Sequence, residues 1–155
     1  MEPAYKESRM VLPMNLAILL SVMMVITWIS MVVTKFFMNA QIPDIALIVC
    51  GIAFALVVVI SFIMRFTIEV YDDRVEIVHF FRKTSIPKDQ IIDTKVGEIN
   101  IIKNYSAWTL KGVKYKTYTA VGEDMGIGLK VTGKRVFFLS STDPDAIAAL
   151  LPKEE

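Results

Sequence analysis

A run of apolar residues at positions 45–64 constrains this chain more than any other feature, because it contains no charged residue. As an α-helix rising 1.5 Å per residue, it would reach about 30 Å, the thickness of the hydrocarbon core of a bilayer. A buried core helix is the alternative, but a helix of this length in a soluble protein normally keeps a polar face. The run therefore predicts a helix that spans a membrane.

A second apolar segment, residues 11–38, precedes it and has no charge between Arg9 and Lys35. Pro13 suits the first turn of a helix, where a missing N–H costs little. A cleaved signal peptide is the alternative, but its apolar region is about 7 to 15 residues long and ends in a small-x-small site. This segment is longer, and residues 36–40 (FFMNA) make a poor site. We therefore predict a second membrane helix.

The connection at residues 39–44 is short enough only for a turn, so the two spans form an antiparallel hairpin. Pro43 ends the first helix, and Asp44 is suited to cap the second. Cations flank the hairpin on both outer sides, whereas the connection has only Lys35 close by; the flanking cations are Lys6, Arg9, Arg65, Arg74, Arg82 and Lys83. The positive-inside rule then predicts a two-pass protein of the cell membrane with both termini cytoplasmic, and residues 1–10 as a short cytoplasmic tail.

Small and hydroxyl-bearing residues within the hairpin suggest how its helices pack. Thr27, Ser30 and Thr34 share one helical face, and Gly51 and Ala55 form a small-xxx-small pair on the second span. Such residues permit close helix approach. The contact is either internal to the hairpin or made with another copy or another membrane protein. No ionisable group lies mid-span, so the hairpin offers no candidate for an ion or proton pathway.

After residue 64 the pattern changes to alternation, which is typical of β-strands. We expect strands at residues 65–71 and 74–81 around an Asp72-Asp73 turn, with a turn at 82–85. Further strands are expected at 86–92, 93–102 and 117–121, and a hairpin at 128–131 and 134–139. A helix should begin at Asp143-Pro144 and lay Ile147, Leu150 and Leu151 on the sheet. The whole is a membrane α+β protein whose β domain, residues 65–155, follows the hairpin with almost no linker.

Several short motifs then occur in a characteristic order. Ile86-Pro87 precedes Ile91, residues 108–112 read WTLKG, residues 126–129 read GIGL, and Ser141-Thr142-Asp143-Pro144 follows the last hairpin. With the two-span hairpin before them, they resemble the prokaryotic PH-like (pleckstrin-homology-like) domains of small two-span membrane proteins; Thr109 departs from the glycine usual there. The resemblance implies a PH-like split β-barrel capped by the C-terminal helix. It implies no enzymatic activity, and such proteins mostly have no assigned function.

Little in the chain points to catalysis, a cofactor or a metal. Cys50 is the only cysteine and His79 the only histidine, so an internal disulfide and a nitrogen–sulfur metal site are both excluded. We interpret the acidic pairs at 72–73 and 123–124 as turn residues, and residues 140–142 as part of a helix cap. The glycines at 122, 126 and 128 lack a phosphate-loop lysine and are interpreted as turn and close-packing residues.

The strongest candidate for a contact surface is the segment 103–118, which mixes lysines and aromatic residues and contains no acid. Aromatic side chains with polar tips suit the headgroup region, and each lysine near an anionic membrane contributes about 1 kcal/mol. The alternative is that Trp108 and some tyrosines are core residues and that the lysines form a solvated edge. The residues expected to contact lipid or a partner are Lys103, Tyr105, Trp108, Lys111, Lys114, Tyr115 and Lys116.

These features predict a non-enzymatic, membrane-anchored interaction module that presents a PH-like domain at the cytoplasmic membrane face. Its partners would be membrane lipid, further copies of the chain or another membrane protein. Nucleic acid is disfavoured by the net charge of +1 and by the membrane anchor. Anionic lipid headgroup binding is the alternative function, and a role as an accessory subunit of a transporter or enzyme is less favoured.

Overall fold

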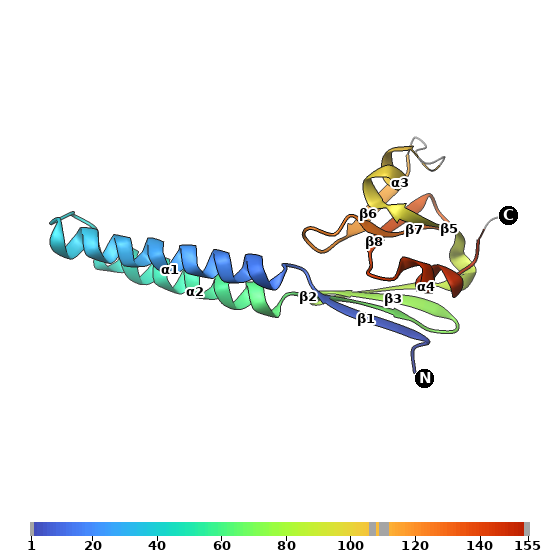
Figure 1. The fold of residues 1–155 in the computed structure, drawn as a ribbon, viewed down its shortest axis with the longest axis horizontal. Coiled ribbons are helices and arrows are strands. Elements are labelled where there is room, and N and C mark those ends of the chain that lie inside the picture. Colours follow the sequence, from blue (N-terminus) through green and yellow to red (C-terminus); the bar gives the residue numbers. More distant parts are fainter. Residues whose placement is uncertain (1, 106–107, 109–111, 154–155) are drawn as a thin grey trace. The chain divides into compact units, whose positions relative to one another are not determined.

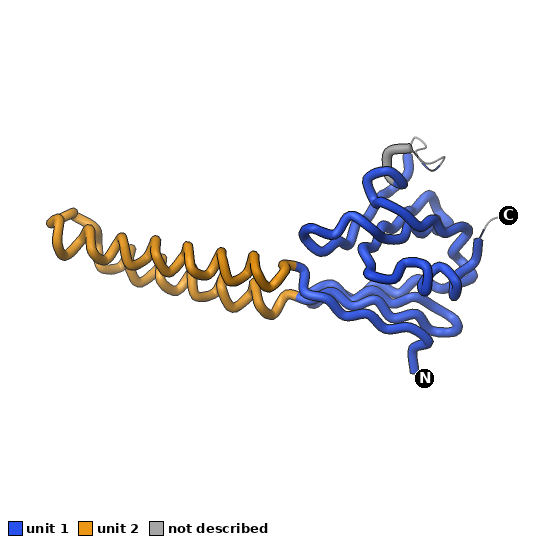
Figure 2. Tube along the Cα trace, viewed as in Figure 1, with its two compact units in different colours: residues 1–11, 65–155 blue, residues 12–64 orange. Residues whose placement is uncertain are grey.

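The computed structural model describes residues 2–105, 108 and 112–153. The chain divides into two compact units, coloured separately in Figure 2. Residues 1–11 and 65–155 form what we call the β unit, and residues 12–64 form the helical unit. The helical unit is thus an insertion into the sequence of the β unit.

The helical unit consists of α1 (Met14–Phe37) and α2 (Asp44–Ile63). Both helices are long and apolar enough to cross a membrane, with mean hydropathy values of 2.6 and 3.0. Most of their apolar side chains are exposed, and the buried residues are Ala17, Leu47 and Ser61. At the connection, Lys35 forms an ion pair with Asp44. The prediction of two long apolar helices joined by a short turn is confirmed.

Trp28 and Gly51 make the best-defined contact between the two helices. The Trp28 indole Nε1–H donates to the Leu47 carbonyl oxygen at 3.1 Å, and a Cβ added at Gly51 would lie 2.9 Å from that nitrogen. Gly51 therefore serves packing within the hairpin. The hydroxyls of Thr27 and Thr34 instead donate to carbonyls four residues back in α1, and Thr27 and Ser30 are exposed.

The first sheet of the β unit has the order β1-β2-β3-β4, with every neighbouring pair antiparallel. Its strands are β1 (Tyr5–Met10), β2 (Arg65–Val70), β3 (Arg74–His79) and β4 (Arg82–Pro87). The two-residue turn at Asp72-Asp73 is confirmed. The turn expected at residues 82–85 is instead the start of β4, where Ile86 is the only buried side chain, so the segment has no visible alternation.

The N-terminal segment is the largest correction to the domain boundaries. Residues 5–10, expected to be part of a polar tail, form β1 and pair with β2 from Tyr5–Val70 to Met10–Arg65. The strand escapes sequence analysis because two charged residues, Glu7 and Arg9, are among its more buried positions. The helical unit therefore connects two adjacent strands, in the position where a β-hairpin would have its turn.

The second sheet has the order β5-β7-β8-β6. Its strands are β5 (Ile91–Glu98), β6 (Lys114–Tyr118), β7 (Met125–Val131) and β8 (Arg135–Ser140), and a short 3-10 helix, η1 (Lys88–Gln90), leads into β5. The β7–β8 hairpin is confirmed, whereas β6 lies parallel to β8. The strand expected at 93–102 stops at Glu98, and the chain continues as α3 (Ile99–Tyr105), because a short apolar run suits either structure.

The main core lies between the two sheets, which Figure 1 shows as separate layers. Phe66, Ile68 and Ile77 enter it from the first sheet, and Ile127 and Leu129 from the second. Burial of each such side chain contributes about 1.5–3 kcal/mol to folding. Among the described residues no strand pairing joins the two sheets, so the structure is α+β but not a closed barrel.

The C-terminal helix α4 (Pro144–Ala149) packs against this core, and the predicted cap is confirmed. The Asp143 carboxylate accepts from the Ala146 N–H at 3.1 Å. Of the three residues expected to face the sheet, Ile147 and Leu151 are buried, but Leu150 is 37% exposed.

A second apolar cluster covers the opposite face of the second sheet. It contains Ile99, Ile102, Trp108, Val136 and Phe138. The second sheet is therefore buried on both faces, with β8 contributing to both clusters.

Candidate interaction surface

The structure separates the residues that the sequence grouped into one contact segment. Lys103 and Tyr105 belong to α3, but their side chains, and all of Lys111, lie outside the described residues. Trp108, Lys114, Tyr115 and Lys116 are described and occupy different environments.

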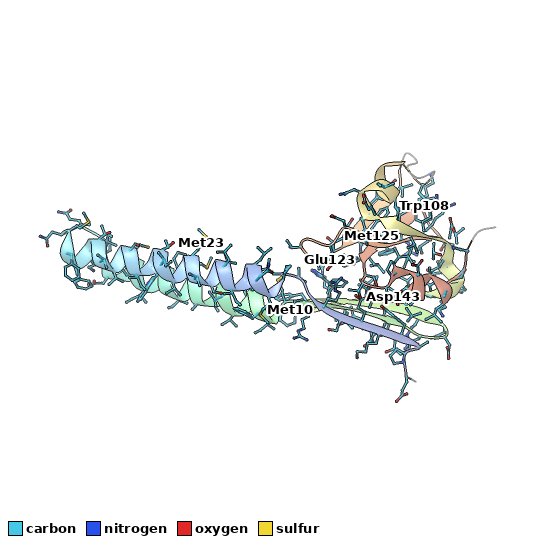
Figure 3. The ribbon with its side chains drawn as sticks, in the orientation of Figure 1. Met10, Met23, Trp108, Glu123, Met125 and Asp143 are labelled. Atoms are coloured by element: carbon cyan, nitrogen blue, oxygen red, sulfur yellow. The ribbon has the colours of Figure 1, made fainter. Side chains whose placement is uncertain are left out.

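Trp108 is a core residue, as the alternative interpretation held. It is 4% exposed and lies on the α3 side of the second sheet (Figure 3). A Cβ added at Gly128 would lie 2.8 Å from its ring, and the Lys95 ammonium is 5.1 Å from its ring centroid. The indole is thus committed to packing and is not available to a lipid headgroup.

Tyr115 also has a structural role on β6. Its hydroxyl donates to the Trp108 carbonyl oxygen at 3.0 Å, and its ring stacks on Phe138 with centroids 5.9 Å apart. Its neighbours Lys114 and Lys116 point to the other face of the strand, because side chains alternate along a strand. Both lysines are exposed, so among the described candidate residues these two have charged side chains that a partner can reach.

Two cations of β8 and its preceding turn join these lysines. Lys114 is in register with Arg135, and its N–H donates to the Lys134 carbonyl oxygen at 2.8 Å. Within the described residues, no acidic side chain forms an ion pair with any of the four. We call Lys114, Lys116, Lys134 and Arg135 the basic edge. Sequence analysis did not find Lys134 and Arg135 because the parallel β6–β8 pairing has no sequence signal.

A small hollow of about 160 Å³ lies beside the basic edge. Ile92, Trp108 and Val113 line it together with Lys130, Lys134 and Arg135, and its surface is almost entirely apolar. Arg135 is held in place by its bonds to the Thr132 carbonyl oxygen and to Gln90 Oε1, both at 3.1 Å. The hollow therefore suits a small apolar group beside the basic edge.

Glu7 is the centre of a polar network that ties β1 to the N-terminal side of α4. Its carboxylate accepts from Ser141 Oγ at 2.5 Å, from Thr142 Oγ1 at 2.8 Å and from the Thr142 N–H at 3.0 Å. Burial alone raises the pKa of Glu7, but the hydrogen bonds from Ser141, Thr142 and Tyr5 outweigh it, so the pKa lies below its ordinary value. Arg9 extends the network by pairing with Glu7 and Glu123.

The Glu7 network and a separate ion pair engage side chains of the types that occur at catalytic and metal sites. Ser141 and Thr142 are engaged by Glu7, Glu123 by Arg9, and Asp73 by Arg74. No group of three potential metal-ligating side chains occurs in the part of the chain that the structure describes.

The basic edge lies at one end of the β unit, and the chain connects to the helical unit at the other. The entry end is defined by Met10, Arg65 and Val121: Met10 pairs with Arg65, and the Val121 N–H donates to the Val11 carbonyl oxygen at 2.8 Å. Figure 3 labels Met10 and Glu123 at this end.

The far end is defined by Asp73, Gln90 and Thr132. The Thr132 N–H donates to Gln90, and the Lys88 N–H donates to Asp73, in each case to the carbonyl oxygen at 2.9 Å. The basic edge adjoins this end, because Lys114 and Arg135 begin β6 and β8.

No protein-family model, curated protein or solved structure matches this chain.

Proposed function

We propose that the protein is a non-enzymatic interaction module, anchored in the cell membrane by α1 and α2, that presents the β unit at the cytoplasmic face. The observation that carries this proposal is the pairing of β1 with β2, which brackets the helical unit. Three residues separate β1 from α1, and Met64 alone separates α2 from β2. Neither connection is long enough to act as a flexible spacer, and each end of the helical unit continues almost directly into a strand of the first sheet.

The positive-inside rule supports the cytoplasmic orientation, since Lys6, Arg9, Arg65 and Arg82 all belong to the β unit. A PH-like fold remains part of this proposal. Two sheets around a shared core and a C-terminal helix against that core support it, whereas the separate sheets and the parallel β6–β8 pair are departures from a split barrel.

The basic edge is the surface that we assign to the partner, which would be an acidic segment of another protein. β6 is an edge strand, so its outer backbone groups are available for strand addition. Its lysines match an acidic partner, although lysines on edge strands also prevent aggregation. The free edge of β6 favours a protein over a lipid, because strand addition requires a second polypeptide backbone.

Charge reversal at the basic edge should weaken partner capture. A photo-cross-linker at Thr117, in the full chain in native membranes, should give a defined adduct whose yield falls several-fold in Lys116→Glu and at high salt, because exposed charge pairs are screened. The matched control is Lys153→Glu, which reverses an exposed charge outside the basic edge and should leave the yield unchanged. A cross-linker at Ser85 on the edge strand β4 should give no adduct.

The proposal fails if Thr117 yields no adduct, or if Lys116→Glu and Lys153→Glu behave alike. An adduct between two copies of the chain would identify the partner as the protein itself.

Anionic lipid headgroup binding is the second candidate, and the four cations of the basic edge favour it. To distinguish lipid binding from protein binding, the full chain is reconstituted in vesicles of phosphatidylcholine with and without phosphatidylglycerol. The readout is the accessibility of Lys116 to an amine reagent. If the basic edge binds headgroups, phosphatidylglycerol should protect Lys116 from the reagent, and salt should remove that protection. We expect no protection, because strand addition to β6 requires a polypeptide backbone that lipid does not supply.

A further inference from the structure

The turn between β3 and β4 carries two exposed phenylalanines, which we call the aromatic turn. Phe80 is 41% exposed and Phe81 is 86% exposed, more than any other large apolar side chain among the described residues. Their rings touch edge to face, with centroids 4.2 Å apart. Folding of the β unit gains almost nothing from Phe81, because so little of it leaves water.

The backbone of the aromatic turn also argues against a purely structural role. His79 pairs with Arg82, so Phe80 and Phe81 are the two central residues of a tight hairpin. Phe80 has φ of 60°, a conformation that is unfavourable for a bulky residue and that glycine normally occupies at this place in a hairpin. Sites that break local rules in this way tend to be functional.

The aromatic turn lies at the entry end of the β unit. The Phe80 N–H donates to the Arg65 carbonyl oxygen at 3.2 Å. Arg65 follows the C-cap residue of α2, Met64, directly in the chain, and it pairs with Met10 at the end of β1. The aromatic turn is therefore bonded to the residue at which the chain leaves a helix of membrane-spanning length.

The turns at the two ends of β3 carry opposite charges. At the entry end the aromatic turn is flanked by two exposed arginines, Arg65 and Arg82, whereas the turn at the other end of β3 is Asp72-Asp73. Exposed aromatic rings beside arginines suit the boundary between headgroups and acyl chains, where the guanidinium groups meet phosphates. The adjacent aspartates of the opposite turn favour an aqueous environment.

We propose that Phe80 and Phe81 insert into the headgroup–acyl boundary of the membrane that α1 and α2 cross, making the aromatic turn a third attachment of the protein to its bilayer. The inference rests on the proposed membrane anchoring. The partner is the lipid bilayer, because the aromatic turn is bonded to the residue that follows the second span.

Quenching of tryptophan fluorescence by lipid tests the proposal on the full chain. The protein is reconstituted in phosphatidylcholine brominated on its acyl chains, with phosphatidylglycerol as the anionic component. The difference in fluorescence between wild type and Trp28→Phe isolates the signal of Trp28 in α1. Trp108 is present in every variant, so its signal is common to all of them. In the Trp28→Phe background, Phe81→Trp places an indole in the aromatic turn, and Asp72→Trp places one in the opposite turn of β3 as the matched control.

We expect brominated lipid to quench Trp28 and the indole of F81W strongly, and the indole of D72W several-fold less. Equal, weak quenching of F81W and D72W together with strong quenching of Trp28 would overturn the insertion of the aromatic turn and leave the membrane anchor in place. Absence of quenching at Trp28 would overturn the anchor, and the insertion with it.

Discussion

Replacing Gly126 by alanine should destabilise the β unit by about 3 kcal/mol or more, the upper range for overpacking a close-packed interior. A Cβ at this position would overlap the backbone carbonyl oxygen of Leu139 on the neighbouring strand β8 and would lie 2.9 Å from Ile99 Cδ1. A backbone group in a paired strand cannot move aside as a side chain can. The measurement is hydrogen exchange of the β7 and β8 amides in the full chain, which should lose protection together.

Gly128 provides the matched control on the same strand. Its added Cβ would meet only side chains, with Trp108 at 2.8 Å and Ile102 at 3.2 Å. Gly128→Ala should therefore cost less, about 1–3 kcal/mol, and that cost should be smaller when it is measured in a Trp108→Leu background. Equal protection in Gly126→Ala and wild type would show that β7 and β8 do not approach as described.

Replacing Glu7 by glutamine should weaken the link between β1 and the start of α4 by about 2 kcal/mol, since hydrogen bonds to a charged group contribute about 1.5–3 kcal/mol each and the amide retains only some of them. The Glu7 side chain is 9% exposed, so water cannot replace the lost partners. Because Glu7 lies on β1, we expect Glu7→Gln to accelerate hydrogen exchange more in β1 than in β3.

The pH dependence gives Glu7 a second test. Its pKa is lower in the folded chain than in the unfolded chain, so its stabilisation is complete above the unfolded pKa of about 4.3 and is lost as the pH falls through the folded pKa. The stability difference between wild type and Glu7→Gln should therefore shrink below about pH 4.3. A difference that stays constant with pH would contradict the assigned network.

Features with a strong local cause could be predicted from the sequence. The two apolar helices follow from uninterrupted hydrophobicity, and the helix beginning at Asp143-Pro144 follows from capping chemistry. The glycines also behave as expected: Gly122 adopts a positive φ of 83°, while Gly126 and Gly128 pack against neighbouring groups.

The features that sequence analysis missed depend on contacts between distant segments. β1 buries a carboxylate instead of an apolar side chain, and Glu7 is satisfied by Ser141 and Thr142, more than a hundred residues later in the chain. Nothing local to residues 5–10 encodes those partners. Only half of the basic edge could be predicted from the sequence. Lys114 and Lys116 lie two residues apart in one segment, whereas Lys134 and Arg135 join them only through strand pairing.

The placement of the helical unit between β1 and β2 affects the order of events during synthesis. β1 leaves the ribosome first, yet its partner strand is made only after both spans. Domains generally fold as units during translation, but this one must leave its first strand unpaired until the hairpin has been synthesised. Completion of the first sheet therefore reports that both long helices have been made, which couples maturation of the β unit to synthesis of the helical unit.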